Sequence, residues 1–201
     1  PPAFELSSIT LAAADETLLA DLTNGGVLAI DGETVVYSSG GAGTGDIFAI
    51  ESDGSGARTL ADDAADDIFL TFENGHVLFR SGTPEKVWTV DVDGGTPETL
   101  RNDATGETFN VALGPMTVMT IVGAGAKTDL VAARTAGGDL RTLASDEDTE
   151  SFRAITPDGR VIYTLNQGAF LDDVFVVNGD GTGAVNLTDR ADEDEFLGFI
   201  P

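Results

Sequence analysis

The sequence of 201 residues lacks cysteine altogether, and it has a single histidine and only two lysines, Lys86 and Lys127. Without cysteine, neither a disulfide framework nor a thiolate metal site can form. No apolar run reaches the roughly 18 residues that a membrane-spanning helix needs, and no signal peptide opens the chain. We therefore expect no direct insertion into a membrane.

Positive charge is also scarce, because 10 Lys and Arg residues stand against 35 Asp and Glu residues, for a formal net charge of −25. Such a surface repels phosphate backbones, since nucleic-acid affinity is built mainly from cationic contacts. Nucleic acid is therefore excluded as a partner. A composition rich in Asp and poor in Lys is also typical of proteins adapted to high salt, and this explanation stands beside that of a specific acidic site.

Glycine, by contrast, is abundant, with 25 residues placed mostly between short apolar runs. A leucine marker recurs at steps of 42, 40, 43 and 44 residues, and an apolar or aromatic marker nine residues later recurs at the same steps. The two series are Leu18, Leu60, Leu100, Leu143 and Leu187, and Val27, Phe69, Phe109, Phe152 and Phe196. Two markers that move together indicate an internal repeat.

Each repeat contains four short runs of strand character separated by Gly-rich turns. In the second complete repeat we expect strands at Phe69–Phe72, His76–Arg80, Val87–Val92 and Glu98–Leu100. Four strands in a unit of about 40–45 residues predict an all-β fold, a β-propeller of four-stranded antiparallel blades. A short helix between Ser8 and Leu22 is the one competing element.

The last complete repeat has the clearest pattern. It runs from Thr156-Pro157-Asp158-Gly159-Arg160-Val161-Ile162-Tyr163 through Asp173-Val174-Phe175-Val176-Val177-Asn178 to Asn186-Leu187-Thr188. This pattern resembles the TolB-type, WD-like β-propeller repeat. The resemblance covers most of the chain and specifies a blade rather than an activity. Members of that family serve as periplasmic interaction modules and as propeller domains attached to peptidases, so the resemblance implies a periplasmic or secreted location.

The repeats predict one propeller domain over residues 1–201. Its units fall at about 1–26, 27–68, 69–108, 109–151 and 152–195, with 195–201 as a closing strand. The C-terminal strand Glu195–Ile200 and the N-terminal segment would together complete a fifth blade, which hides the free edges of a ring. The alternative is that the chain is a fragment of a larger propeller.

Acidic residues recur two positions before the marker that opens the first strand of a repeat. They are Asp67, Glu107, Glu150 and Asp194, with Asp66 and Glu195 adjacent. The first strand of a propeller blade is innermost, so we expect these side chains to rim one mouth of the central channel and to bind a ligand there. A hard cation would relieve their mutual repulsion, which predicts Ca²⁺ bound by Asp67, Glu107, Glu150 and Asp194. The alternative is an acidic surface without a specific site.

Two further sets of residues are interpreted structurally. A second acidic series follows the leucine marker by three residues, where an Asp side chain commonly bonds the backbone in an Asx-turn; it comprises Asp21, Asp63, Asp103 and Asp146. The single tryptophan, Trp88, stands where other repeats have Phe48, Val131 and Phe175, which predicts packing between blades.

The sequence contains no G-x-S-x-G nucleophile elbow. The leading hypothesis is therefore a non-enzymatic, extracytoplasmic propeller that serves as a binding or scaffold module for another protein, with an axial cation. The alternative is a propeller enzyme, a carbohydrate-active hydrolase or lyase, that uses the channel-mouth carboxylates and a bound metal.

Overall fold

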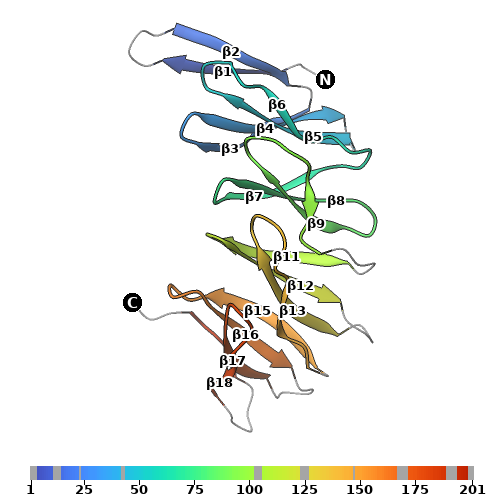
Figure 1. Ribbon diagram of the computed structural model, residues 1–201, viewed down its shortest axis with the longest axis vertical. Helices are drawn as coiled ribbons and strands as arrows, with labels where there is room; N and C mark the ends of the chain where they lie inside the picture. Colours follow the sequence, from blue (N-terminus) through green and yellow to red (C-terminus); the bar gives the residue numbers. More distant parts are fainter. Residues whose placement is uncertain are drawn as a thin grey trace. The chain divides into compact units, whose positions relative to one another are not determined.

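The computed structural model describes residues 4–10, 15–22, 24–41, 44–101, 106–122, 127–146, 148–166, 172–188 and 194–198. Over these ranges all regular secondary structure is β-strand. The strands form one two-stranded sheet and four four-stranded sheets, all of them antiparallel (Figure 1). The chain divides into two compact units, Pro1–Thr99 and Leu100–Pro201.

The first unit opens with a β-hairpin made of β1 (Phe4–Thr10) and β2 (Asp15–Leu22), which pair antiparallel. The helix considered for Ser8 to Leu22 is therefore wrong over the described part of that stretch. The β-hairpin is favoured over a helix because it buries Leu22 against Val35 and Tyr37 of the next sheet. This burial offsets the helix propensity of the leucines.

Two four-stranded meanders complete the first unit. The first consists of β3 (Gly26–Asp31), β4 (Thr34–Gly41), β5 (Thr44–Glu51) and β6 (Arg58–Ala61). The second consists of β7 (Ile68–Glu73), β8 (His76–Ser81), β9 (Lys86–Asp91) and β10 (Glu98–Thr99). The strand predictions for the second repeat are thus confirmed to within one or two residues.

The second unit contains two meanders of the same order. They consist of β11 (Glu107–Leu113), β12 (Met116–Val122), β13 (Thr128–Arg134) and β14 (Arg141–Ala144), and of β15 (Thr149–Ile155), β16 (Arg160–Asn166), β17 (Asp172–Asn178) and β18 (Val185–Asn186). Each sheet pairs its strands in sequence order, as a propeller blade does.

Tight turns hold the meanders together. Between β7 and β8, Asn74 and Gly75 have φ angles of 52° and 77°, the left-handed pair that a type I′ hairpin requires. The side chain of Asn tolerates this region and Gly enters it freely, so the Asn-Gly dipeptide fixes the turn locally.

A feature that the sequence did not predict is a β-bulge in the first strand of every four-stranded sheet. The register shifts directly after the marker residue each time, between Val27 and Ala29, Phe69 and Thr71, Phe109 and Val111, and Phe152 and Ala154. A bulge bends the strand and increases its twist. Its recurrence shows that the four repeats share backbone detail as well as strand count.

The core of each unit lies between neighbouring sheets. In the first unit Ile47 and Leu60 of one sheet pack with Val77 and Phe79 of the next, and Trp88 packs against this cluster, as predicted. In the second unit the matching cluster joins the two sheets there, with Val118, Leu130, Leu143, Val161 and Tyr163 among its members. Neighbouring sheets therefore cover each other's apolar faces, as blades do.

The C-terminal segment differs from the prediction. No strand forms over residues 195–198, and Ile200 lies outside the described residues. Instead the Asp194 N–H donates to the Asp172 carbonyl at 2.9 Å, and Phe196 packs on the cluster of Ile162, Val174 and Val176. One backbone hydrogen bond and the packing of Phe196 thus hold this segment against the last sheet, without the strand pairing that was predicted. Closure of a ring by both chain ends stays a prediction, as does a single domain.

Candidate functional site

Three of the predicted acidic site residues are buried where the first strand of a sheet begins. Asp67 is 6% exposed, Glu107 8% and Glu150 1%. Asp194 is half-buried, whereas Asp66 and Glu195 are exposed. The spacing from the marker therefore places three of these acids at equivalent buried positions, and their location at a channel mouth stays a prediction.

Asp67 has the most unusual environment of these carboxylates. Its backbone N–H donates to the Gly45 carbonyl at 2.9 Å, yet neither carboxylate oxygen has a hydrogen-bond partner among the described residues. The pKa of Asp67 is raised to about 6, mainly by burial; the charges of Asp63 and Asp46 add to the rise, and the nearby Ser81 hydroxyl opposes it. Burial without a partner favours the neutral acid.

The neighbouring acids are engaged by the backbone. Oδ1 of Asp66 accepts the Gly45 N–H at 2.8 Å, which ties the loop before β7 to the start of β5. Oδ1 of Asp63 accepts the Ala65 N–H at 2.6 Å, which confirms the Asx-turn predicted there, and its Oδ2 accepts the Ser81 hydroxyl at 2.9 Å.

Glu150 plays a comparable part in the second unit. Its Oε1 accepts the Asp146 N–H at 2.6 Å, while Oε2 has no hydrogen-bond partner among the described residues. Burial raises the pKa of Glu150, and the charges of Asp129 and Asp146 add to that effect. The carboxylate therefore closes the loop that links β14 to β15, at the cost of one unsatisfied oxygen.

Asp194 lines a polar cavity of about 430 Å³ together with Arg153, Asp172 and Glu195. Over the described ranges, no three acidic or histidine side chains come together in a way that could hold a metal ion. Asp67 belongs to the first unit and Glu107, Glu150 and Asp194 to the second. The four-residue calcium ring therefore stays a prediction.

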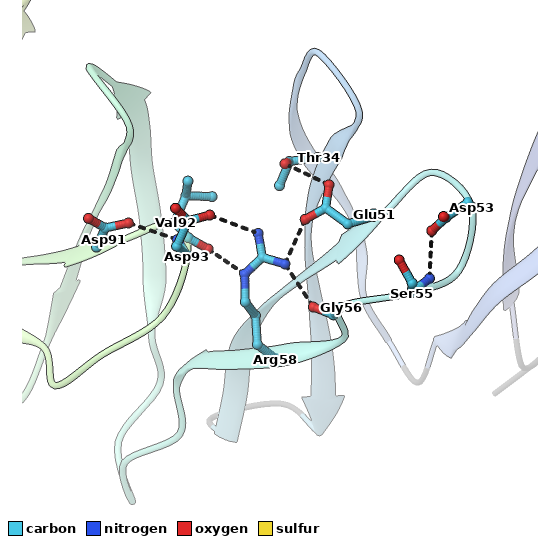
Figure 2. Close-up of polar contacts among 9 residues, drawn as sticks. All are labelled: Thr34, Glu51, Asp53, Ser55, Gly56, Arg58, Asp91, Val92 and Asp93. Carbon is cyan, nitrogen blue, oxygen red and sulfur yellow. Dashed lines mark hydrogen bonds and ion pairs between the residues drawn. The ribbon is translucent and has the colours of Figure 1, made fainter.

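The contact that sequence reasoning missed is made by Arg58, which joins the two four-stranded sheets of the first unit (Figure 2). Its Nε donates to the Val92 carbonyl at 2.5 Å, and its Nη1 donates to Glu51 Oε1 at 2.8 Å and to the Gly56 carbonyl at 2.7 Å. Asp93 adds an ion pair at 4.0 Å. The Arg58 side chain is only 16% exposed, so solvent screens its bonds to Val92 and Glu51 less than its ion pair with Asp93, whose side chain is 91% exposed.

A signal for this contact exists in the sequence. The segment Arg58-Thr59-Leu60-Ala61 recurs as Arg141-Thr142-Leu143-Ala144, and both are last strands of their sheets. In the second unit a Cβ added at Gly181 would lie 2.4 Å from the Thr142 carbonyl oxygen. In each unit the third turn of one sheet therefore rests on the last strand of the sheet before it.

A second missed feature is a pocket of about 270 Å³ in the first unit, between its two four-stranded sheets. Its lining consists of Ala61, Asp62, Asp63, Phe79, Trp88, Thr96 and Pro97. Phe79 and Trp88 are direct cross-strand partners whose rings stack at 6.4 Å and 12°. The indole N–H of Trp88 is buried and has no hydrogen-bond partner among the described residues. The sequence signal for this pocket is the single tryptophan, for which the repeat predicts packing between blades.

Neither a protein-family model nor a curated protein sequence matches this chain. Solved structures do. Porphyromonas gingivalis dipeptidyl peptidase 4 matches with a TM-score of 0.67 and 10% identity over 93% of this chain and 30% of that chain. The tricorn protease matches with a TM-score of 0.63 and 8% identity over 89% of this chain and 22% of that chain. TolB from Acinetobacter baumannii matches with a TM-score of 0.47 and 16% identity over 92% and 48%. The chain thus spans less than half the length of each of these three proteins.

The repeated meanders and these structural similarities define the class: the chain has a β-propeller fold. The fold confirms that the pattern from Thr156 to Thr188 forms a four-stranded blade, and the TolB-type repeat stays a resemblance of the sequence. Over the described residues, no helix is long or apolar enough to cross a membrane.

Proposed function

We propose that this chain is a non-enzymatic propeller module that binds another protein. The observation that carries the proposal is the pocket between the two four-stranded sheets of the first unit, which is concave, partly aromatic and edged by two carboxylates. Pockets of this composition, apolar with a few placed polar groups, are typical binding sites. Aromatic side chains are also the commonest anchors of protein interfaces.

The charge of the chain supports a protein partner with a basic surface. A net charge of −25 attracts a positively charged protein over distance and raises its association rate, most strongly at low salt. The TolB-type repeat that the sequence resembles is found in periplasmic interaction modules. We accordingly include a periplasmic or secreted location in the proposal.

An axial Ca²⁺ held by Asp67, Glu107, Glu150 and Asp194 is a further part of the proposal. Its support is that the first three of these carboxylates are buried, since a bound cation would offset the cost of removing a charged carboxylate from water. The bound ion would serve to stabilise the fold.

The test is reconstitution with a purified partner. Immobilised protein is used to capture candidates from an extract, and each candidate is then purified and mixed with the chain at defined salt. We expect one partner to form a stoichiometric complex that weakens as salt rises. Absence of any reconstituted complex contradicts the proposal, and so does turnover of a polysaccharide that is abolished by Asp67→Asn, which would establish the enzyme.

A further inference from the structure

We propose that the Trp88 pocket receives a basic side chain, arginine or lysine, from the partner protein. This inference rests on the proposed function and names the chemistry by which the partner is recognised. The occupant follows from three properties of the pocket: its walls are held in place, its charged groups are anionic, and aromatic rings line it together with the acids.

The walls come from four separate segments that the fold holds together. Phe79 lies on β8 and Trp88 on β9, Asp62 and Asp63 follow β6, and Thr96 and Pro97 precede β10. Phe79 is 2% exposed and belongs to the core cluster, and the two hydrogen bonds to Asp63 fix its carboxylate. A pocket with such walls is largely formed before the ligand arrives, which lowers the entropic cost of binding.

The charged side chains that line the pocket are both acidic. Asp62 and Asp63 line it, and Asp63 is close enough to Asp67 to raise the pKa of that buried acid, as Asp46 also does. A ligand with positive charge lowers the repulsion among these acids, whereas an anionic ligand adds to it. Electrostatics therefore selects a cation.

The aromatic rings favour an organic cation over a metal ion. A guanidinium or ammonium group is attracted to an aromatic face when it lies within about 6 Å of the ring centre, and Trp is the most favourable ring. The alkyl part of an arginine or lysine side chain can lie along Phe79 and Pro97 while its head group reaches Asp62 and Asp63.

The second unit has a different residue at the position equivalent to Phe79. There the matching cross-strand pair is Tyr163 and Phe175, which stack at 5.3 Å. Burial raises the pKa of the Tyr163 hydroxyl to about 12, and the charges of Asp146 and Glu150 contribute. Asp146 corresponds to Asp63 in the repeat, so a tyrosine hydroxyl lies near that acid in one unit. Phe79 has no hydroxyl, and the pocket beside Asp63 stays open for a donor from outside.

Trp88 is the one tryptophan of the chain, so its fluorescence reports on the pocket alone. The test titrates the intact protein with N-acetylargininamide and N-acetyllysinamide at fixed ionic strength, and with the neutral citrulline analogue as the matched probe. We expect a saturable change in Trp88 emission with the two cations and none with citrulline at the same concentrations. Asp62→Asn should weaken arginine binding about threefold, the effect of one partly exposed charge.

Phe79→Tyr is the sharper variant, because it copies the residue that the second unit uses. Its hydroxyl should occupy the space beside Asp63 and weaken arginine binding about tenfold, a loss of the size of one hydrogen bond. Asp31→Asn, which removes an exposed charge on β3, is the control and should leave the affinity unchanged. Unfolding curves of all three variants separate a loss of binding from a loss of folding.

Three outcomes would overturn the inference: equal responses to arginine and citrulline, equal weakening by Asp31→Asn and Asp62→Asn, or a saccharide that binds where arginine does not. If a reconstituted partner binds wild type and Phe79→Tyr equally well, the pocket is not its contact, while the proposed function itself stands. If arginine saturates the pocket but no partner complex forms, the failure lies in the proposed function.

Discussion

The side chain of Arg58 and the backbone carbonyl of Val92 are joined by a hydrogen bond of 2.5 Å across two neighbouring sheets of the first unit. The two residues are 34 positions apart in the sequence, nearly one repeat. The bond therefore links the last strand of one blade to the turn before the last strand of the next blade, and it complements the apolar cluster between the two sheets.

Replacing Arg58 should weaken the first unit. Arg58→Met keeps the apolar stem but removes the bonds to Val92, Gly56 and Glu51, and hydrogen bonds to charged groups are worth about 1.5–3 kcal/mol each. We expect the free energy of unfolding to fall by at least about 3 kcal/mol in urea denaturation. Arg80→Met, which breaks the exposed pair with Glu85, is the control and should cost under about 1 kcal/mol. Equal losses would show that Arg58 acts as a surface charge only.

The pKa of Asp67 predicts how stability varies with pH. Because the pKa is raised to about 6 in the folded chain, the folded state holds this proton more tightly than the unfolded state. The stabilisation is present below the unfolded pKa of about 4 and is lost as pH rises through about 6. Glu150, whose pKa is also raised, contributes in the same direction.

Asp67→Asn should remove much of that pH dependence. The amide is neutral at every pH, so we expect the variant to be more stable than wild type at pH 8 by about 1–2 kcal/mol. Urea denaturation at pH 4, 6 and 8 measures the effect. Asp53→Asn is the control of opposite sign, because bonds from Ser55 lower the pKa of Asp53. A pH profile of Asp67→Asn that runs parallel to that of wild type would rule out Asp67 as the titrating group.

Gly181→Ala tests how closely the sheets of the second unit approach. The added Cβ would lie 2.4 Å from the Thr142 carbonyl oxygen, and the φ of 82° is already unfavourable for alanine. Gly159→Ala is a matched control with the same φ of 82° and open space around the new Cβ. We expect about 1–2 kcal/mol of destabilisation for the control from backbone strain, and at least about 1 kcal/mol more for Gly181→Ala. Indistinguishable melting curves would show that the turn does not rest on β14.

The response of the melting temperature to Ca²⁺ distinguishes a specific calcium site from a general adaptation of the acidic surface to salt. If Asp67, Glu107, Glu150 and Asp194 bind Ca²⁺, submillimolar Ca²⁺ should raise the melting temperature at fixed ionic strength, since a ligand that binds only the folded state stabilises it. Glu150→Gln should reduce the rise. If the melting temperature instead follows KCl concentration and ignores Ca²⁺, the acids act through general repulsion that salt screens.

Much of the fold was predictable because its determinants are local. The alternation of apolar residues in segments such as Val77–Phe79, and the Asn74-Gly75 turn that follows β7, set strands and hairpins within a few residues of each other. Local sequence does not decide between a helix and the hairpin of β1 and β2, since the leucines there suit either conformation. Only burial against Val35 and Tyr37 decided between them.

The sequence by itself determined the repeat, the four-stranded sheets and the positions at which acids recur, because each depends on spacing along one chain. Tertiary structure alone decided that Asp67 and Glu150 are buried, that Arg58 reaches Val92, and that Asp63 and Trp88 share a pocket. Those relationships depend on how one sheet lies on the next. That packing is set by the shape and twist of whole sheets, and no short stretch of sequence contains it.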